Sequence, residues 1–343
     1  MTPAAMPPSR KPRSAAARRR HCAPRIGAGE RGIALVLALW LTILLTVIAS
    51  GFAFSMRSEA IAARNAITLA QARAAADGAV ERALFELSRP RLVDAWAPDG
   101  QQHLWRENDA TLVVTAVDET SKIDLNSANE ALLKGLLTAV GGLDDDAAVH
   151  VVDAIIDWRD PDDLRRPNGA EAAEYRAANL KYGPANAPFE SVGEVARVLG
   201  VTPTVYTRIA PSLTVYSRQP GINPLTASRD VLLALPAATP DLVDRYIQQR
   251  LDALSSKLPV PFFPAAQAFG AGAIPVWRVR AEAHLADGVT FIREAVLRPV
   301  ADVRRPLIAL AWLDGARASP LPPGPENSTG PAASNSENNA RRP

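Results

Sequence analysis

An uninterrupted apolar run near the N-terminus is the strongest pattern in the chain. No charged side chain occurs from Ile33 to Met56, and most of these residues are Leu, Ile, Val or Ala. At about 1.5 Å per residue, a helix of this length spans roughly 36 Å, which exceeds a hydrocarbon core of about 30 Å. We therefore expect a transmembrane helix, because a soluble helix of this composition would need protein on all sides.

The helical pattern continues beyond the apolar run. Residues 57–88 contain no proline and many alanines, and their apolar positions recur every three or four residues until Pro90. One helix over residues 33–89 is thus predicted, half in lipid and half outside. Its outer half is interpreted either as a spacer or coiled-coil stalk, or as a stem packed on a globular head.

Strand patterns flank a block of short helices. The apolar segment 110–118 follows an Asn108-Asp109 turn, and strand patterns return from Val276, with Asp287-Gly288 as a hairpin turn. Between them, short helical segments are separated by Pro, Gly and Asn. The prediction is an α+β fold in which a large all-helical domain is inserted into one antiparallel sheet.

These patterns also set the expected domain boundaries. Beyond Asp314 the chain offers almost nothing to bury, so we expect a disordered tail there. The expected segments are a basic leader (1–32), a membrane and stem helix (33–89), the first sheet strands (90–120), the helical insertion (121–255), the remaining strands (256–314) and the tail (315–343).

The helical block contains a loose internal repeat. Residues 123–137 and 221–235 share an Asn-containing start, a Ser or Ala turn and a Leu-rich helix. Each is followed by a helix that ends in a basic residue, at 151–159 and at 242–250. This outline is typical of helix-hairpin-helix modules.

Charge is distributed unevenly along the chain. The 38 basic and 36 acidic residues nearly cancel, but residues 1–31 hold eight basic residues and only one acid, Glu30. A basic leader stays on the cytoplasmic side of a membrane, which places everything after Met56 on the far side.

Several classes of protein are excluded by what the chain lacks. The single cysteine, Cys22, excludes an internal disulfide, and the four scattered histidines give no pair at zinc-ligand spacing. No Ser/His/Asp or Cys/His constellation and no phosphate-binding glycine loop can be assembled. We therefore expect no enzymatic activity.

The sequence resembles the type II secretion minor pseudopilin K family. The matching segments occur in order over residues 31–250. They are RGIALVLALWL (31–41), SKIDLNSANEALL (121–133), AIIDWRDPDD (154–163), NGAEAAEYR (168–176), YGPANAPFESVGEV (182–195) and GINPLTA (221–227).

This resemblance implies a pilin-like sheet and a processing site. Cleavage by a prepilin peptidase is expected between Gly32 and Ile33, followed by N-methylation of Ile33. Most pilin-like subunits carry Glu at the fifth mature position, where this chain has Leu37. An unpaired carboxylate in lipid is costly, so Leu37 fits a subunit that has no neighbour above it.

The resemblance also implies a role, partners and a location. The expected role is to sit at the tip of the periplasmic pseudopilus with minor pseudopilins I and J, to initiate assembly and to cap growth during protein export. Minor pseudopilin H, major pseudopilin G and the prepilin peptidase are further expected partners. The expected location is the inner membrane, crossed once, with the N-terminus cytoplasmic and the head periplasmic.

The densest acidic cluster is a candidate cation site. Carboxylates that converge from one loop suit Ca²⁺, which takes six to eight oxygen ligands in proteins. The resemblance implies calcium in this domain, and the candidate ligands are Asp157, Asp160, Asp162 and Glu171. The alternative is that these acids cap helices and pair with Arg159, Arg165 and Arg166.

Two other functions remain as alternatives. The repeat favours a membrane-anchored DNA receptor, and the anchor alone would suit a generic tethered scaffold. DNA binding is opposed by charge, because residues 118–215 contain 16 acidic and 9 basic residues where phosphate binding needs a basic face. We therefore expect no nucleic acid partner.

Overall fold

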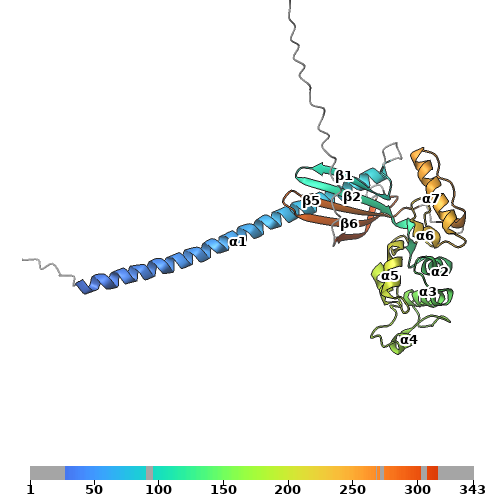
Figure 1. Ribbon diagram of the computed structural model, residues 1–343, viewed down its shortest axis with the longest axis horizontal. Helices are drawn as coiled ribbons and strands as arrows, with labels where there is room; N and C mark the ends of the chain where they lie inside the picture. The colour runs from blue at the N-terminus through green and yellow to red at the C-terminus, as the bar shows by residue number, and fades with distance from the viewer. Residues whose placement is uncertain (1–27, 90–95, 268, 271–273, 303–306, 316–343) are drawn as a thin grey trace, which may run out of the picture. The chain divides into compact units, whose positions relative to one another are not determined.

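The structure is a computed structural model that describes residues 28–89, 96–267, 269–270, 274–302 and 307–315 (Figure 1). The chain forms two compact units, one that ends at Asn65 and one that begins at Ala66. The expected leader falls mostly outside the described residues, as does Cys22, and so does the expected tail beyond residue 315.

Helix α1 (Ala28–Ser88) is a single uninterrupted helix. Its continuity past residue 56 confirms the prediction from the proline-free pattern, and it ends before Pro90 as expected. In the first unit its apolar side chains are exposed, as at Leu37, Trp40 and Leu45. Among the described residues α1 is the one helix that is long and apolar enough to cross a membrane.

The second unit contains a five-stranded antiparallel sheet in the order β1-β2-β5-β6-β7. The strands are β1 (Asp99–Glu107), β2 (Ala110–Asp118), β5 (Trp277–Leu285), β6 (Thr290–Pro299) and β7 (Leu307–Asp314). Both predicted hairpins form, one at Asn108 and one at Gly288, which have positive φ angles of 51° and 87°.

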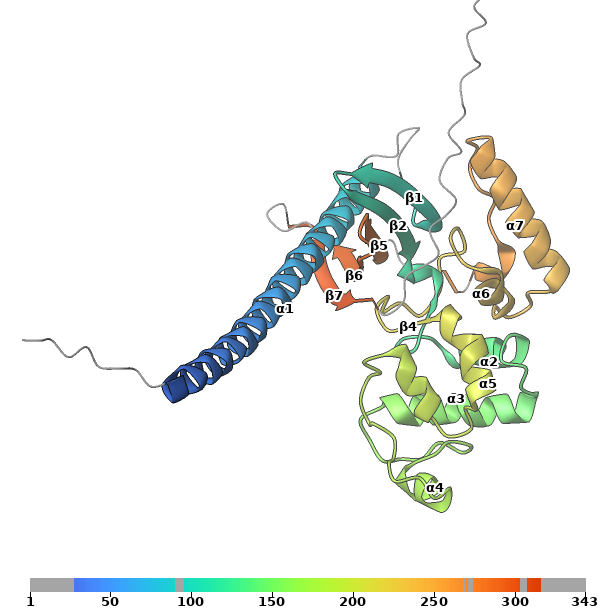
Figure 2. The ribbon, with the colours of Figure 1, turned by 60° about the vertical axis from the view of Figure 1, so that its left-hand side comes forward.

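The C-terminal part of α1 covers one face of this sheet (Figure 2). Its buried residues are mostly alanines, such as Ala76 and Ala83, which pack on Val114, Val279 and Ala295. Small side chains let a helix approach a sheet closely, and the apolar area that they remove from water stabilises the contact. This finding favours the packed stem over a free stalk.

One buried arginine ties α1 to two strands. Arg293 on β6 is 2% exposed and donates to Asp77 of α1 at 2.5 Å and to Asp314 of β7. Its guanidinium also lies 5.1 Å from the ring centre of Phe291 and 5.3 Å from that of Trp312. A buried charge held in this way costs several kcal/mol to leave unpaired, so it fixes the register of the three elements.

The helical insertion separates two strands that are direct neighbours. Asp118 at the end of β2 pairs with Trp277 at the start of β5, and residues 119–276 lie between them. The regular elements of the insertion are η1 (Glu119–Ser121), β3 (Ile123–Asp124), α2 (Glu130–Ala139), α3 (Asp145–Arg159), α4 (Ala172–Ala177), η2 (Val192–Arg197), α5 (Pro203–Ile209), η3 (Ala210–Ser212), β4 (Leu213–Thr214), α6 (Arg229–Leu233), α7 (Pro240–Ser255) and η4 (Pro264–Ala266).

The insertion has its own core and differs in detail from the prediction. Leu133, Ile155, Val231 and Phe263 belong to one buried cluster that is distinct from the core under the sheet. The insertion is not entirely helical, because β3 and β4 form a short parallel ladder. Its regular structure also extends past the predicted boundary at residue 255, to η4.

Candidate functional site

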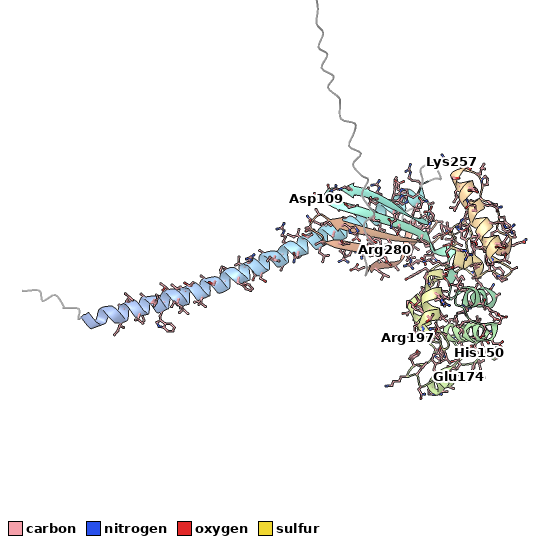
Figure 3. The ribbon with its side chains drawn as sticks, viewed as in Figure 1. Asp109, His150, Glu174, Arg197, Lys257 and Arg280 are labelled. Atoms are coloured by element: carbon pink, nitrogen blue, oxygen red, sulfur yellow. The ribbon has the colours of Figure 1, made fainter. Side chains whose placement is uncertain are left out.

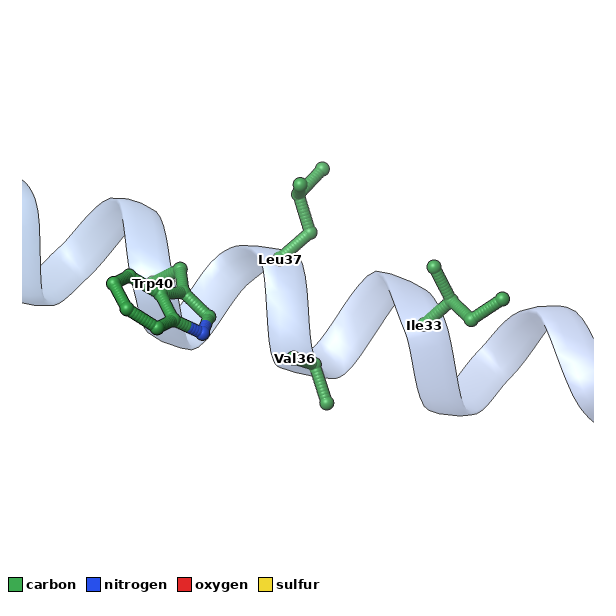
Figure 4. A pocket seen from close by; sticks show the side chains of 4 residues that line it. All are labelled: Ile33, Val36, Leu37 and Trp40. Carbon is green, nitrogen blue, oxygen red and sulfur yellow. The ribbon is translucent and has the colours of Figure 1, made fainter.

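The predicted processing site lies at the start of α1. Gly32 and Ile33 are consecutive residues of this helix, and the Ile33 side chain is 72% exposed. Leu37 follows one turn later and is 71% exposed, beside Val36 and Trp40 (Figure 4). All four side chains are apolar, so this stretch presents an apolar surface to lipid or to another helix.

The second predicted site, the acidic cluster, lies in the last turn of α3 and in the loop that follows it. Asp157, in the last turn of α3, is fully buried. Its carboxylate accepts the main-chain N–H of Arg166 at 3.2 Å. Burial raises the pKa of Asp157, and Asp160 nearby raises it further.

Close packing fixes the Asp157 carboxylate in place. A Cβ atom added at Gly169 would lie 2.0 Å from Asp157 Oδ2, which is shorter than any contact that a real side chain makes. Gly169 is therefore required here for the close approach of the loop to the carboxylate.

Two further predicted ligands carry buried oxygens that lack hydrogen bonds. Both carboxylate oxygens of Glu171 and Oδ1 of Asp160 are buried without a hydrogen-bond partner among the described residues. Burial raises the pKa of Glu171 to about 7, and the charges of Asp157, Asp163 and other acids add to the shift. Burial and Asp162 likewise raise the pKa of Asp160. Unpaired buried oxygens in an acidic surrounding are what a cation would neutralise.

The loop also places one amide oxygen that sequence reasoning missed. Asn186 donates through Nδ2 to Asp163 at 2.7 Å, and its Oδ1 is buried without a partner among the described residues. The signal that was available is its place between two prolines in the segment PANAP (184–188), where a polar side chain is held in a rigid loop.

The fourth predicted ligand, Asp162, lies differently. It is exposed, and its carboxylate accepts the main-chain N–H of Leu164 at 2.9 Å, which is a local turn contact. Within the described parts of the chain, no group of three or more His, Cys, Asp or Glu side chains is arranged to hold a metal ion. The structure thus brings the acids near one another without forming a complete ligand sphere.

The neighbouring arginines are engaged elsewhere. Arg166 forms ion pairs with Asp153 at 2.8 Å and with Glu130 at 2.5 Å. The Arg165 guanidinium lies 3.5 Å from the carboxylate of Glu174, a residue of α4 that is labelled in Figure 3. These contacts leave the buried oxygens of Asp160 and Glu171 without a basic partner among the described residues.

His150, also labelled in Figure 3, is an exposed residue of α3. Its Nδ1 lies 3.0 Å from the carbonyl oxygen of Asn168. The ring thus has a main-chain partner although the residue is exposed. This contact offers no metal-binding geometry.

A further group of polar residues, which was not predicted from the sequence, lies where the sheet meets the insertion. Glu119 is fully buried and forms ion pairs with Arg278 of β5 at 2.7 Å and with Lys122 at 2.8 Å. Burial by itself raises the pKa of Glu119, but hydrogen bonds and charges from Arg278 and Lys122 outweigh it and hold the pKa below its ordinary value. The hydroxyl of Thr214 also donates to this carboxylate.

Asp118 makes a second connection between the sheet and the insertion. Its carboxylate accepts hydrogen bonds from Asn223 at 2.8 Å and from Thr226 at 3.1 Å. Both residues lie in the segment GINPLTA (221–227) that was singled out from the sequence. This motif therefore fastens the second half of the insertion to the end of β2.

The internal repeat is confirmed as two similar helical hairpins. Arg159 at the end of α3 donates to the carbonyl oxygens of Leu125 and Ala128, which precede α2. Arg250 of α7 donates in the same way to Pro224 and Ala227, which precede α6, both at 2.9 Å. These guanidiniums are bound to their own main chain, which removes them from any phosphate-binding surface.

The first helix of each hairpin is capped by the residue directly before it. The N-cap residues are Asn129 for α2 and Ser228 for α6. Asn126, before α2, binds the main chain of Phe189 through both of its side-chain amide atoms, at 3.0 and 2.7 Å. Asp144, the first of three consecutive aspartates, caps α3.

Together these features define a class of protein: a pilin-like α+β head with a helical insertion, carried by one long N-terminal helix. A crystal structure of the GspK–GspI–GspJ complex from the type 2 secretion system of enterotoxigenic Escherichia coli contains a chain of this fold. The TM-score is 0.53, the identity is 18%, and the match covers 76% of this chain and 99% of that chain.

Sequence comparisons find similar proteins with one shared description. The family model described as type II secretion system protein K matches residues 110–218. Type II secretion system protein K of Klebsiella pneumoniae is 29% identical over 60% of this chain and 69% of its own length. The protein of the same name from Pectobacterium carotovorum is 30% identical over 42% of each chain. A putative protein K of Escherichia coli K12 is 26% identical over 53% of this chain and 61% of its own length.

The resemblance to the type II secretion system protein K family is thereby confirmed, and this chain is a relative of these proteins. The same comparisons support the classification of this chain as a minor pseudopilin of the type II secretion system.

Proposed function

We propose that this chain is the minor pseudopilin at the tip of the periplasmic pseudopilus, where it initiates assembly and caps growth during protein export. The observation that carries the proposal is the continuous helix α1, which joins an apolar N-terminal half to a stem packed under a pilin-like sheet. A large head that carries an extra helical domain suits a cap, because its bulk blocks the addition of another subunit above it.

The N-terminal half of α1 would anchor the subunit in the inner membrane before assembly. The basic leader then lies in the cytoplasm, the head lies in the periplasm, and the chain crosses the membrane once. The prepilin peptidase would cut between Gly32 and Ile33 and leave the apolar helix as a retained anchor. Mass spectrometry of the chain, co-expressed with its prepilin peptidase, should find methylated Ile33 as the first residue. An intact leader would contradict the proposal.

The tip position is tested by the residue at the fifth mature position. Leu37→Glu should impair tip placement, because the carboxylate has no amine from a subunit above it to neutralise it. Leu41→Glu, one helical turn further along, is the matched control for the general cost of a charge in lipid. Normal secretion and unchanged pseudopilus length in Leu37→Glu would contradict a tip position.

The partners proposed for this chain follow from the structural comparison. The similar fold comes from a complex that contains GspI and GspJ, so we propose the I- and J-type minor pseudopilins as neighbours, with H and the major pseudopilin G below them. Transient contact of this chain with the prepilin peptidase would precede its assembly with these neighbours. We expect the role to be structural, without catalysis.

A structural Ca²⁺ in the acidic loop is proposed as part of the same function. The donors are of the type that Ca²⁺ takes, because Glu171 and Asp160 offer buried oxygens without hydrogen bonds and Asn186 offers an amide oxygen. Asp157 lies beside them and contributes negative charge. When bound, the ion would neutralise the buried acids and order the loop after α3. Titration calorimetry with CaCl₂ on the full chain tests this, and an absence of binding would exclude the site.

A further inference from the structure

The two edges of the sheet differ in chemistry. At one edge, β1 carries polar and charged side chains, including Gln101, Arg106 and Glu107. At the other edge, β7 has no charged side chain from Leu307 to Leu313. Natural sheets protect their edges with charges, proline or bulges, because unpaired main-chain groups recruit other strands. The β1 edge has such protection over its length, whereas β7 has a charge only at its end.

The β7 side chains are apolar and exposed on both faces. Ile308 is 43% exposed, Trp312 39% and Leu313 50%. Trp312 pairs with Ala295, which belongs to the core under α1, whereas Leu313 pairs with Glu294. Successive residues of a strand point to opposite faces, so an added strand would find apolar contacts on both sides.

Along β7, the main-chain N–H and C=O groups of successive residues point alternately toward β6 and toward the outer side of the sheet. The N–H of Gly315 donates to the carbonyl of Ile292 at 3.0 Å, which marks these two as a hydrogen-bonded pair. Hydrogen-bonded and non-hydrogen-bonded pairs alternate in an antiparallel ladder. Leu313 therefore directs its main-chain groups toward β6, and Trp312 and Asp314 direct theirs outward. In the described sheet no strand lies on this outer side.

We propose that the outer edge of β7 is a strand-addition site for an extended, largely apolar segment from the head of a different pilin-like subunit. The unpaired N–H and C=O groups specify an extended polypeptide, and the exposed apolar side chains specify its composition. This inference rests on the proposed function, because a single copy at the tip leaves a different subunit as its neighbour. Residues 316–343 are a poorer occupant, since five of the first sixteen are proline and cannot donate to a ladder.

The test places charges on this edge and compares the two edges of the same sheet. Full-length chain is co-expressed in membranes with the I- and J-type pseudopilins of its own secretion system, and the amounts that co-purify are measured. The test variant combines Ile308→Lys and Leu313→Lys, whose native side chains are exposed. The matched control is Leu104→Lys on β1, where the native side chain is 40% exposed.

We expect the double variant to co-purify with about tenfold less of one partner, or with less still, whereas Leu104→Lys should co-purify with the wild-type amount. The reason is that a lysine on a paired edge must be desolvated or displaced, which weakens the pairing. Circular dichroism of both variants checks that the head is folded. As a second readout, hydrogen exchange of residues 307–314 should slow in the complex relative to the chain alone, since the outward N–H groups become bonded.

Each alternative outcome overturns a specific claim. Equal capture of the partners by wild type and double variant, with unchanged exchange at β7, would overturn the strand-addition site but leave the proposed function standing. Self-association through β7, detected without the partners, would assign the edge to a second copy. Protection of β7 that disappears when residues 316–343 are deleted would assign it to this chain's own segment. Capture of neither partner by the wild type would overturn the proposed function and this inference together.

Discussion

Arg159 and Arg250 make the same contact in two different hairpins of one domain. Each guanidinium donates to two carbonyl oxygens, three residues apart in sequence, in the loop that precedes the first helix of its hairpin. Three of the four residues whose carbonyls they bind, Leu125, Ala128 and Ala227, are almost fully buried, and Pro224 is partly buried. The insertion therefore holds two copies of one supersecondary unit, each closed by an arginine of its second helix. Arg159 is the last residue of α3, whereas α7 continues past Arg250 to Ser255, beyond the helix end expected from the sequence.

The first prediction concerns these arginines. Arg159→Ala and Arg250→Ala should each lower the free energy of unfolding by about 2 kcal/mol, because each substitution removes the donor to two main-chain carbonyls of the insertion. Arg229→Ala is the control, since its ion pair with Asp244 is exposed, and little change is expected there. Urea denaturation of the full chain in detergent measures the difference. Equal effects at all three positions would show that the main-chain contacts do not stabilise the hairpins.

Acid stability should depend on Glu119. Its folded pKa lies below its ordinary value of 4.5, so its ion pairs stabilise the fold above that pH. This contribution is lost as the pH falls through the lowered pKa, because the folded state must then take up a proton. Glu119→Gln should cost about 3 kcal/mol near neutral pH and should remove this part of the acid sensitivity. Thermal melting as a function of pH measures both effects.

The exposed Glu81 provides the control for that experiment. Glu81→Gln should leave the acid transition where it is in the wild type. If Glu119→Gln melts in parallel with the wild type at every pH, the buried pair does not link the insertion to the sheet.

The close approach at Asp157 predicts a pair of glycine variants with opposite outcomes. Gly169→Ala should cost about 2 kcal/mol, because the new methyl must displace a buried carboxylate. At Gly183 an added Cβ would meet Ala172 at 3.6 Å, an ordinary contact. Gly183→Ala should therefore be neutral or stabilising by up to about 0.5 kcal/mol. Melting temperatures of the two variants decide whether the loop around Asp157 is as tightly packed as described.

Calcium binding should depend on pH through Glu171. With its pKa near 7, this carboxyl is largely protonated in the folded, ion-free chain at lower pH. Ca²⁺ must displace that proton, so its affinity should rise as the pH increases from about 6 to about 8. In a chelator, the same raised pKa should make the fold less stable as the pH rises from 4.5 to about 7.

Two variants separate the site from general charge effects. Glu171→Gln should weaken calcium binding and flatten the pH dependence, whereas Glu190→Gln, at an exposed position, should change neither. Titration calorimetry and thermal melting in Ca²⁺ or chelator provide the measurements. Undiminished calcium binding by Glu171→Gln would remove this residue from the ligand set.

The long helix and the hairpins could be predicted because each depends on local patterns. The apolar and alanine-rich run up to Pro90 specifies α1, and turn residues such as Asn108 and Gly288 mark the hairpins. The two-residue ladder between β3 and β4 could not be predicted, because strands this short show no alternation in sequence. The N-caps Asn129 and Ser228 could not be predicted either, because several Ser, Thr and Asn residues stand near each helix start, and only the fold selects one.

The acidic loop illustrates what residue type alone does not determine. Sequence spacing identified Asp157, Asp160, Asp162 and Glu171 as one cluster, but the fold buries Asp157 against main-chain N–H groups and leaves Asp162 exposed. The contribution of Asn186 depends on a contact with Asp163, which lies 23 positions earlier in the chain. Such pairings arise from tertiary structure, which local periodicity does not encode.

The position of the insertion has a consequence for how the head folds. Because Asp118 pairs directly with Trp277, the whole of residues 119–276 must close as one loop before β2 and β5 can join. Closing a flexible loop of that length is entropically costly, and a ladder that depends on it forms slowly. If the insertion folds first, its buried contacts through Asp118 and Glu119 bring the two strand ends together in advance. The helical domain would then act as an intramolecular template on which the sheet nucleates.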